Sequence, residues 1–314
     1  MGRFFLTRLA MAVPTTLIVA ITVFLLIRLI PGDPVTVLLG DMPNPKAVAA
    51  LQAKLGLDQR LPVQFLYWAK HALLGDFGKS ISQGEDVLPL VLQRFTVSAC
   101  IVVAAVFFAS LIAVPAGMIA AWNQNKSIDF ILIGTATLLL SIPAFWLGLL
   151  LLVLFGLKLH WLPVLGYVSL SEDWRRGVIY MVMPVLTLLL TEAGILIRMA
   201  RASTLEVLRL DYITHARAKG LSEFAILSRH AFRNAFAPTW TLIGLILGNL
   251  LGSIAVVETV FNIPGLGRLL IDSIFARDYP VVQGCLIFVA LVYVVVNLVV
   301  DLMYPFFDPR IAAE

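Results

Sequence analysis

Long apolar runs constrain the fold of this chain more than any other feature of its sequence. A helix needs roughly 20 apolar residues to cross the hydrocarbon core of a membrane. Six stretches meet this requirement, at about 9–30, 95–122, 130–157, 178–198, 236–260 and 282–304. Because 60% of the 314 residues are hydrophobic and only 13% are charged, the composition indicates a membrane-embedded chain. We therefore expect an all-α polytopic membrane protein with six transmembrane helices.

The distribution of lysine and arginine predicts how these helices are oriented. Eleven such residues flank one side of the predicted spans and six flank the other, with the long segment 31–94 left out. Since positive loops stay in the cytoplasm, we expect both termini there and segment 31–94 on the outer face. The first apolar run ends in Arg28 and Pro31 without a small-residue cleavage site, so we interpret it as a retained anchor helix. The net charge of +4 reflects cytoplasmic loops, and we expect no nucleic-acid partner.

The outer segment carries local patterns of its own. A turn is predicted at 31–35 (PGDPV), and short amphipathic helices are predicted at 45–57 and 62–74. In the second of these helices the apolar face consists of Phe65, Trp68, Ala69 and Ala72. Aromatic residues at such a position suit a helix that lies at the membrane interface.

Sequence patterns for enzymatic chemistry are weak. Residues 73–80 (LLGDFGKS) end like a phosphate-binding loop, but Leu73 stands where the first glycine should be, so we predict a turn. The four histidines are scattered without metal-ligand spacing, and no nucleophile elbow occurs. Cys100 and Cys285 lie inside apolar runs and are interpreted as inert thiols. We expect a chain that is not an enzyme and binds no cofactor or metal itself.

Three acidic residues fall within or near the predicted spans, namely Glu192, Glu258 and Asp301. Ionisable groups inside a membrane are functional candidates by default. Glu192 is nearest the middle of its span, whereas Glu258 and Asp301 are close to span ends. A proton-coupled transporter would need a chain of such groups, so we favour structural pairing for these residues.

A polar stretch at 211–238 (DYITHARAKGLSEFAILSRHAFRNAFAP) interrupts the apolar runs. Good helix formers predict a helix over 205–219, and Gly220 stands where a C′ glycine ends a helix. Its apolar positions are Leu205, Leu208, Tyr212 and Ala216. Ser222 can cap a second helix with Glu223 in its first turn. Two capped helices hinged at a glycine are more structure than a solvated loop needs.

The second helix of this stretch has an apolar stripe of Phe224, Leu227 and Ala231 beside basic residues, and Pro238 is expected to open the next span. An exposed apolar face next to positive charge is typical of a protein docking surface. The plain alternative is a loop that only satisfies the positive-inside rule. We favour docking.

The same stretch resembles the coupling loop, or EAA loop, of bacterial ABC-importer permeases of the peptide and nickel branch. The matching residues are ARAKGL at 216–221, HAFRNA at 230–235 and Pro238. Thr214 and His215 depart from the broader permease pattern, and such departures are usual in this branch. The similarity extends over essentially the whole chain, through stretches such as RLIPGDP at 28–34, SIPAFW at 141–146 and PGLGR at 264–268.

The resemblance implies a type I ABC-importer permease fold. Its parts would be an N-terminal transmembrane helix plus extracytoplasmic segment at 1–94, a permease core with five transmembrane helices at 95–305, and a short cytoplasmic tail at 306–314. The chain would lie in the bacterial inner membrane beside a second, homologous permease. Two ABC ATPase subunits would bind ATP and magnesium, and an extracytoplasmic solute-binding protein would deliver the cargo.

The resemblance also implies roles for residues of the coupling loop. The ATPase-coupling residues would be Tyr212, Ala216, Arg217, Ala218, Lys219, Gly220, Leu221 and Phe224. Those that support the loop would be His230, Arg233, Asn234 and Pro238. Gly220 would allow the sharp turn, Ala216 and Ala218 would leave room for close approach, and Arg217 and Lys219 could pair with acidic groups of the ATPase.

Several functions remain open at this point. Peptide, glutathione and nickel or metal-chelate importers share this permease pattern. A secondary transporter that uses Glu192 and a membrane scaffold that transports nothing belong to other classes. The absence of a histidine or cysteine cluster in the predicted spans favours peptides over bare metal.

Overall fold

A computed structural model describes residues 2–29 and 59–307 of this chain, with side chains described over 10–25 and 59–303. In chain order, its helices are α1 (Gly2–Leu29), α4 (Leu61–Leu73), α5 (Val87–Trp122), α6 (Ser127–Ser141), α7 (Ala144–Leu151), the π-helix η1 (Leu152–Lys158), α8 (Trp174–Leu208), α9 (Asp211–Ala218), α10 (Glu223–Ala225), the π-helix η2 (Ile226–Ala231), α11 (Phe232–Ser253), α12 (Ala255–Val260), α13 (Leu266–Phe275) and α14 (Tyr279–Phe307). The predicted turn at 31–35 and helix at 45–57 lie outside the described residues.

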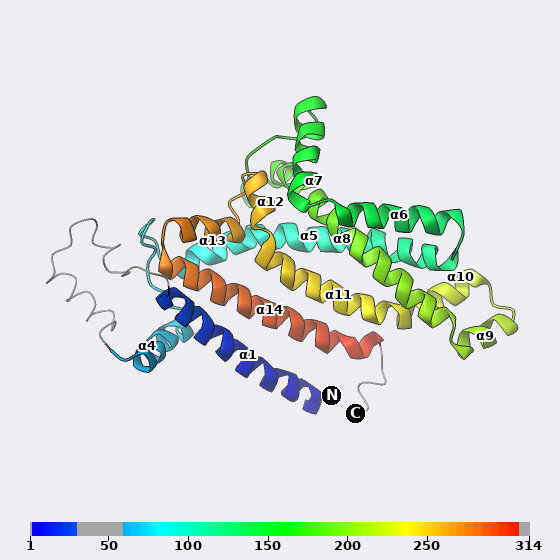
Figure 1. Cartoon of the computed structure of the whole chain (residues 1–314), viewed down its shortest axis with the longest axis horizontal. Coiled ribbons are helices and arrows are strands. Elements are labelled where there is room, and N and C mark those ends of the chain that lie inside the picture. Colours follow the sequence, from blue (N-terminus) through cyan, green and yellow to red (C-terminus); the bar gives the residue numbers. More distant parts are fainter. Residues whose placement is uncertain (1, 30–58, 308–314) are drawn as a thin grey trace.

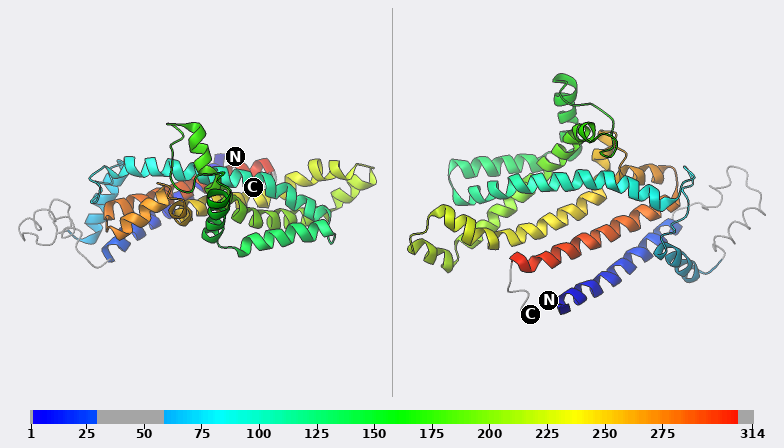
Figure 2. Two further views of the ribbon diagram at one scale, coloured as in Figure 1. Left: turned by 90° about the horizontal axis from the view of Figure 1, so that it is seen from above. Right: turned by 180° about the vertical axis from the view of Figure 1, so that it is seen from behind.

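The long helices run side by side along the length of the molecule. In Figure 1, α5, α11, α14 and α1 follow one another across the bundle, and α8 crosses close to α5. The same arrangement is visible from behind in Figure 2. The expected all-α polytopic fold class is confirmed.

The expected six spans are not all present as single long helices. Four helical stretches of the described chain are long and apolar enough to cross a membrane. They are Val87–Trp122, Trp174–Leu208, Glu223–Ser253 and Tyr279–Met303. A fifth span results if α6 and the helix after it are counted together, and α1 is a helix of 28 residues whose apolar part includes Ala10–Leu25.

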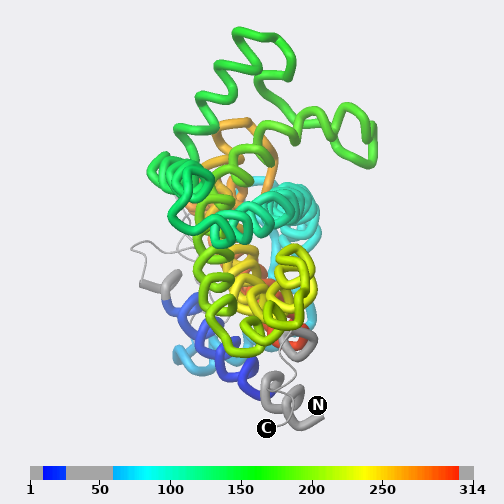
Figure 3. Tube along the Cα trace, turned by 90° about the vertical axis from the view of Figure 1, so that its right-hand side faces the viewer, coloured from blue at the N-terminus to red at the C-terminus, as the bar shows by residue number. Residues whose placement is uncertain are grey.

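The prediction of one continuous helix over 130–157 is wrong. The chain bends by 99° between Ser127–Ser141 and Ala144–Lys158. Pro143 has no backbone N–H and disfavours helical geometry at the residue before it, and Ile142 is accordingly extended with φ −94° and ψ 121°. As a result α7 runs at a steep angle to α6 and packs against α8 and α12, and the green part of the chain projects from the bundle in Figures 1 and 3.

The predicted span over 236–260 also differs from the structure. α11 begins four residues earlier, at Phe232, and ends at Ser253, so that Glu258 belongs to the separate short helix α12. Pro238, which we expected to open this span, lies inside α11. The hydrophobic sequence continued past the end of the helix because α12 is itself buried against the bundle through Ala255 and Val257.

The core of the molecule lies between α5 and α8 and extends to α11. Small side chains such as Ala105, Ala109 and Ala113 on α5 are fully buried, as is Leu196 on α8. Without a hydrophobic driving force between helices in lipid, small residues that allow close packing stabilise such a pair. Pro184 does not interrupt α8, which continues as one helix through this position.

The helix predicted at 62–74 is confirmed as α4, and its position at the membrane interface stays a prediction. The expected apolar face is the half-buried one, and two of its aromatic side chains contact α1. The ring of Phe24 lies 5.3 Å from that of Phe65 and 5.7 Å from that of Trp68, between centroids. The turn predicted at 73–80 is also confirmed, with Gly75 and Gly78 both at φ 80°.

Candidate functional site

The polar stretch at 211–238 forms one end of the molecule. In Figure 1, α9 and α10 lie at the far end of the bundle from α13, and the long helices α8 and α11 lead into and out of them. We call this segment the coupling loop. The helix expected over 205–219 is interrupted, since α8 ends at Leu208 and α9 begins at Asp211 after an extended Leu210.

The glycine hinge and the cap are both confirmed. Gly220 has φ +75°, a left-handed conformation that suits glycine because it has no Cβ. Ser222 is extended, and its Oγ accepts a hydrogen bond from the backbone N–H of Ala225 at 3.4 Å. Glu223 lies in the first turn, as expected. After Ala225 the chain continues as a π-helix, η2, which the sequence pattern did not predict.

A small core of its own holds the coupling loop together. It consists of the buried residues Val207, Ile213, Ala216, Ile226, Ala231 and Ala235. Ala216 and Ala231 were expected at the docking surface, but they point into this core, with 5% and 0% of their surface exposed. Burial of these apolar side chains makes α9 and η2 one packed unit, so Ala216 contributes close packing inside the loop and no contact surface.

The opposite side of the loop exposes apolar groups next to positive charge. Phe224 is 81% exposed, Leu221 is 40% exposed and Tyr212 is 36% exposed. Arg217, Ala218 and Lys219 are exposed between them in the chain. An 81% exposed phenylalanine on an ordered, capped turn buries little of its side chain against the described chain, and such exposure is typical of a contact residue for a partner.

Two polar interactions connect separate parts of the coupling loop, and the sequence alone did not reveal them. The hydroxyl of Tyr212 donates to the carbonyl of His230 at 3.3 Å and accepts from the Asn234 amide at 2.9 Å. Nε of Arg217 lies 3.2 Å from the carboxylate of Glu223, across the Gly220 turn. Of the expected support residues, His230 and Asn234 thus hold α9 directly, whereas Arg233 is exposed on α11 and Pro238 lies further along the same helix. Spacings of six to 22 residues carry no periodic signal, so pattern analysis misses such pairs.

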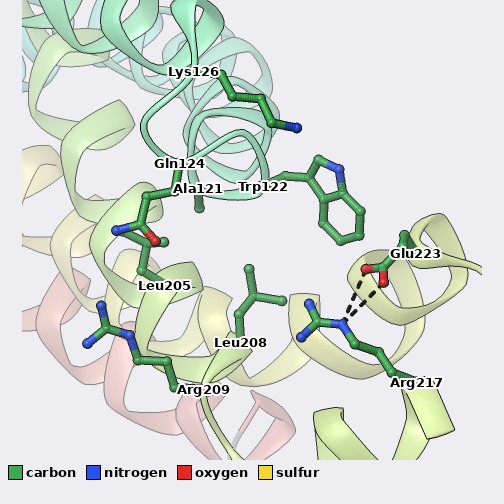
Figure 4. A pocket seen from close by; sticks show the side chains of 9 residues that line it. All are labelled: Ala121, Trp122, Gln124, Lys126, Leu205, Leu208, Arg209, Arg217 and Glu223. Carbon is green, nitrogen blue, oxygen red and sulfur yellow. Dashed lines mark hydrogen bonds and ion pairs between the residues drawn. The ribbon is translucent and has the colours of Figure 1, made fainter.

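A polar pocket of about 410 Å³ lies beside the coupling loop, and Figure 4 shows its side chains. Trp122, Gln124 and Lys126 line one side, from the turn after α5. The end of α8 contributes Leu205, Leu208 and Arg209, and the Arg217–Glu223 pair closes the far side. The α5–α6 turn therefore lies next to the coupling loop, and the sequence did not predict that these two segments are neighbours.

The α5–α6 turn is itself anchored by a buried ion pair. Nε and Nη2 of Arg201 on α8 lie 2.6 and 2.7 Å from the two carboxylate oxygens of Asp129 on α6. Oδ2 of Asp129 also accepts the backbone N–H of Asn125 at 3.0 Å. Asp129 is only 3% exposed, and this bidentate geometry is the strong form of a charged hydrogen bond.

The three acidic candidates of the spans have different surroundings. Glu258 is fully buried and paired, since it accepts from Ser98 Oγ at 2.5 Å and from the backbone N–H of Arg268 at 2.8 Å. Glu192 is half-buried in the middle of α8 and makes no hydrogen bond or ion pair with the described residues. Structural pairing therefore holds for Glu258 and not for Glu192 within that part of the chain. Asp301 is half-buried on α14.

These observations define a class of protein, an all-α membrane protein with an ordered polar loop at one end that exposes apolar side chains next to basic ones. The chain belongs to the family of binding-protein-dependent transport system inner membrane components, whose profile matches residues 113–313. The profile for the N-terminal part of these membrane components matches residues 1–102. It is accordingly a permease component of an ABC importer and a multi-pass protein of the inner membrane.

Curated relatives agree with this family. A probable peptide ABC transporter permease of Sinorhizobium fredii is 39% identical over 99% of both chains. A putative peptide transport system permease of Brucella suis biovar 1 is 39% identical over the same share. The glutathione transport system permease GsiC of Salmonella typhimurium is 40% identical, again over 99% of both chains. A solved amino acid ABC transporter with histidines matches 71% of this chain and 94% of its own at 18% identity, with a TM-score of 0.46, which is too low to compare the folds.

Proposed function

We propose that this chain forms half of the translocation pathway of an ATP-driven importer for di- and oligopeptides, and that the coupling loop connects it to a cytoplasmic ATPase. The observation that carries the coupling proposal is the ordered, capped turn at 219–224 with Phe224 81% exposed. The cargo class is supported by the names of the relatives, two of which are peptide transport permeases.

Closely related cargoes remain as alternatives within this proposal. A relative named for glutathione transport matches as well as those named for peptides, and glutathione is itself a small peptide. A nickel or metal-chelate cargo is the second candidate. We favour peptides, because relatives that match 99% of this chain are named for peptide transport.

In the proposed mechanism the coupling loop acts as a rigid lever. The Ile213 and Ile226 core and the Tyr212–Asn234 hydrogen bond tie α9 to the start of α11, so a push on α9 is passed to a helix that enters the bundle. Arg217, Lys219 and the exposed Phe224 would contact a groove of the ATPase. Two sites and a rigid element between them are what allosteric coupling requires.

In the proposed function, ATP hydrolysis and cargo delivery are carried out by partner proteins. A second, homologous permease would complete the pathway, two ATPase subunits would bind ATP and magnesium, and an extracytoplasmic binding protein would deliver the cargo. No catalytic residue and no cofactor is proposed for this chain. The coupling loop and both termini would lie in the cytoplasm, in keeping with the positive residues of the loop.

Ion-coupled secondary transport is the candidate from another class. It is favoured by one observation, the half-buried Glu192 without a partner among the described side chains. One acidic group is little for a proton relay, which uses chains of such groups. A scaffold that only recruits a partner would account for the coupling loop but not for a buried bundle of this length.

Transport measurements separate these functions. The permease pair, ATPases and binding protein are reconstituted in vesicles with a labelled dipeptide outside, and uptake is compared with and without ATP at the ATPase side. We expect uptake only with ATP, and none from vesicles that hold this chain alone. Ion-driven uptake by this chain alone, abolished by Glu192→Gln, would establish a secondary transporter in its place.

A further inference from the structure

A second polar pocket lies at the end of the bundle opposite the coupling loop. It encloses about 380 Å³ and is lined by parts of the chain far apart in sequence. Its polar side chains are Gln83, Arg94, Tyr167, Asn262, Arg268 and Asp272. In Figure 1 this is the end that carries α13 and the start of α5. We call it the Arg94 pocket.

Among the described residues, no acidic side chain forms an ion pair with Arg94, which lines this pocket. Its guanidinium donates once, from Nη1 to the carbonyl of Pro264 at 3.3 Å. Its Nε is buried and has no hydrogen-bond partner in the described chain. Nε is shielded from solvent, but a guanidinium carries five N–H donors, so one hydrogen bond to Pro264 leaves donors of the terminal nitrogens for an acceptor in the pocket.

The other charges of the pocket balance one another. Arg268 lies 3.6 Å from the carboxylate of Asp272 and donates to the side-chain carbonyl of Asn262. Tyr167 adds a neutral donor, because burial raises the pKa of its phenol. The pocket thus offers the guanidinium of Arg94, which forms no ion pair with the described residues, together with neutral hydrogen-bonding groups.

Buried hydrogen bonds fix the backbone beneath this charge. Ser98, one turn after Arg94 on α5, donates to Glu258 and accepts the backbone N–H of Leu266 at 2.8 Å. Glu258 in turn accepts the N–H of Arg268, which holds the start of α13 against α5. A Cβ on Gly265 would come within 2.0 Å of the Glu258 carboxylate, so glycine is needed for this close approach. A pocket whose supporting groups are locked in this way is pre-organised for a ligand.

We propose that the Arg94 pocket binds a carboxylate of the cargo as it enters the permease. The inference rests on the proposed function, since peptides and glutathione both carry a free carboxylate. Guanidinium and carboxylate groups match in charge and planar geometry. The pocket is at the end opposite the coupling loop, where cargo arrives in an import cycle.

The test compares a carboxylate cargo with its neutral form. The complete importer in vesicles is given the dipeptide Ala-Ala or its C-terminal amide, each supplied bound to the binding protein. Arg94→Gln should lower ATP-dependent uptake of the dipeptide by about tenfold, the usual effect of losing a charged hydrogen bond, and leave uptake of the amide unchanged. Unchanged amide uptake also shows that the variant is folded. Arg94→Lys should restore part of the dipeptide uptake.

Arg175 provides the matched control. It is an exposed arginine at the start of α8 that stacks on Trp174 at 5.4 Å and lies outside the pocket. Arg175→Gln should alter neither uptake. If Arg94→Gln lowered uptake of both cargoes equally, or lowered neither, the inference would be overturned. ATP-dependent uptake by the wild-type importer would still support the proposed function. If Arg94→Gln weakened the docking of cargo-free binding protein, the inference would be overturned too, because Arg94 would then contact the binding protein and not the cargo. If the wild-type importer took up neither probe, both proposals would fail.

Discussion

The hydroxyl of Tyr212 accepts the Asn234 amide at 2.9 Å and joins the coupling helix α9 to the first turn of α11, 22 residues further along the chain. Tyr212→Phe removes this hydrogen bond and the one to the His230 carbonyl. We expect each lost bond to cost about 1 kcal/mol, so that the loop loosens without unfolding. Peptide uptake per ATP hydrolysed should therefore fall while ATP hydrolysis continues. Tyr293→Phe is the control, because its hydroxyl makes no hydrogen bond to the described residues, and an equal loss there would contradict the account.

Gly220→Ala tests the hinge of the coupling loop. No atom lies within 4 Å of a Cβ at this position, so the cost is only that of a left-handed backbone, about 1–2 kcal/mol for a non-glycine residue. We expect weaker retention of the ATPase by the purified permease. Gly84→Ala has the same backbone cost, with φ +74° and open space, at the other end of the molecule. Equal retention of the ATPase by both variants would show that the hinge geometry is unimportant.

Asp129→Asn should destabilise the whole bundle. The substitution leaves Arg201, only a quarter exposed, without its counter-ion between α6 and α8. Breaking a buried pair from one side costs about 3 kcal/mol or more. Asp173→Asn removes an exposed partner of Arg176 at 3.5 Å, for which about 0–1 kcal/mol is expected. Thermal unfolding in detergent should therefore shift clearly for the first variant and little for the second, and similar shifts would contradict the assignment.

The hydrogen bonds to Asp278 predict that the folded protein loses stability in acid. Burial raises the pKa of this carboxyl, but hydrogen bonds from Ser80 Oγ at 2.6 Å and from Ser82 outweigh burial and hold the pKa below its usual 3.8. Because the folded pKa is lowered, the carboxylate stabilises the fold above about pH 3.8, and this contribution is lost as the pH falls through the folded value. Proteolysis of the 80–86 turn should rise as the pH is lowered from about 5 to about 3. Asp278→Asn should remove this pH dependence, and an unchanged profile would refute the assignment.

The sequence was sufficient for those parts of the fold that depend on local pattern. Apolar length predicted the long helices, and the preference of glycine and serine for helix ends predicted the turn at Gly220 and the cap at Ser222. The bend at Pro143 was readable in principle, since proline restricts the residue before it, but the apolar run continues through the bend and hides it. Apolar periodicity also cannot tell a buried face from a docking face, and Ala231, expected in the exposed apolar stripe, is buried in the core of the coupling loop.

The contacts that build the sites could not be predicted in the same way. Ser98 and Glu258 are 160 residues apart in the chain, and only the packing of α13 against both α5 and α12 brings them together beneath Arg94. The same holds for Asp129 and Arg201, which single-sequence patterns leave as two unrelated charges. Pairings of this length are set by tertiary structure, and no local propensity reports them.

The most direct test of the account is a cross-linking measurement on the intact importer. A photoreactive benzoylphenylalanine replaces Phe224 on the coupling loop or, as the control, Phe275 at the end of α13, which is equally exposed at 84%. After irradiation, the cross-linked partner is identified by mass spectrometry. The account predicts a cross-link from position 224 to an ATPase subunit and none from position 275 to that subunit. A cross-link to the ATPase from position 275, or its absence at position 224, would contradict the coupling of this permease through its 211–238 loop.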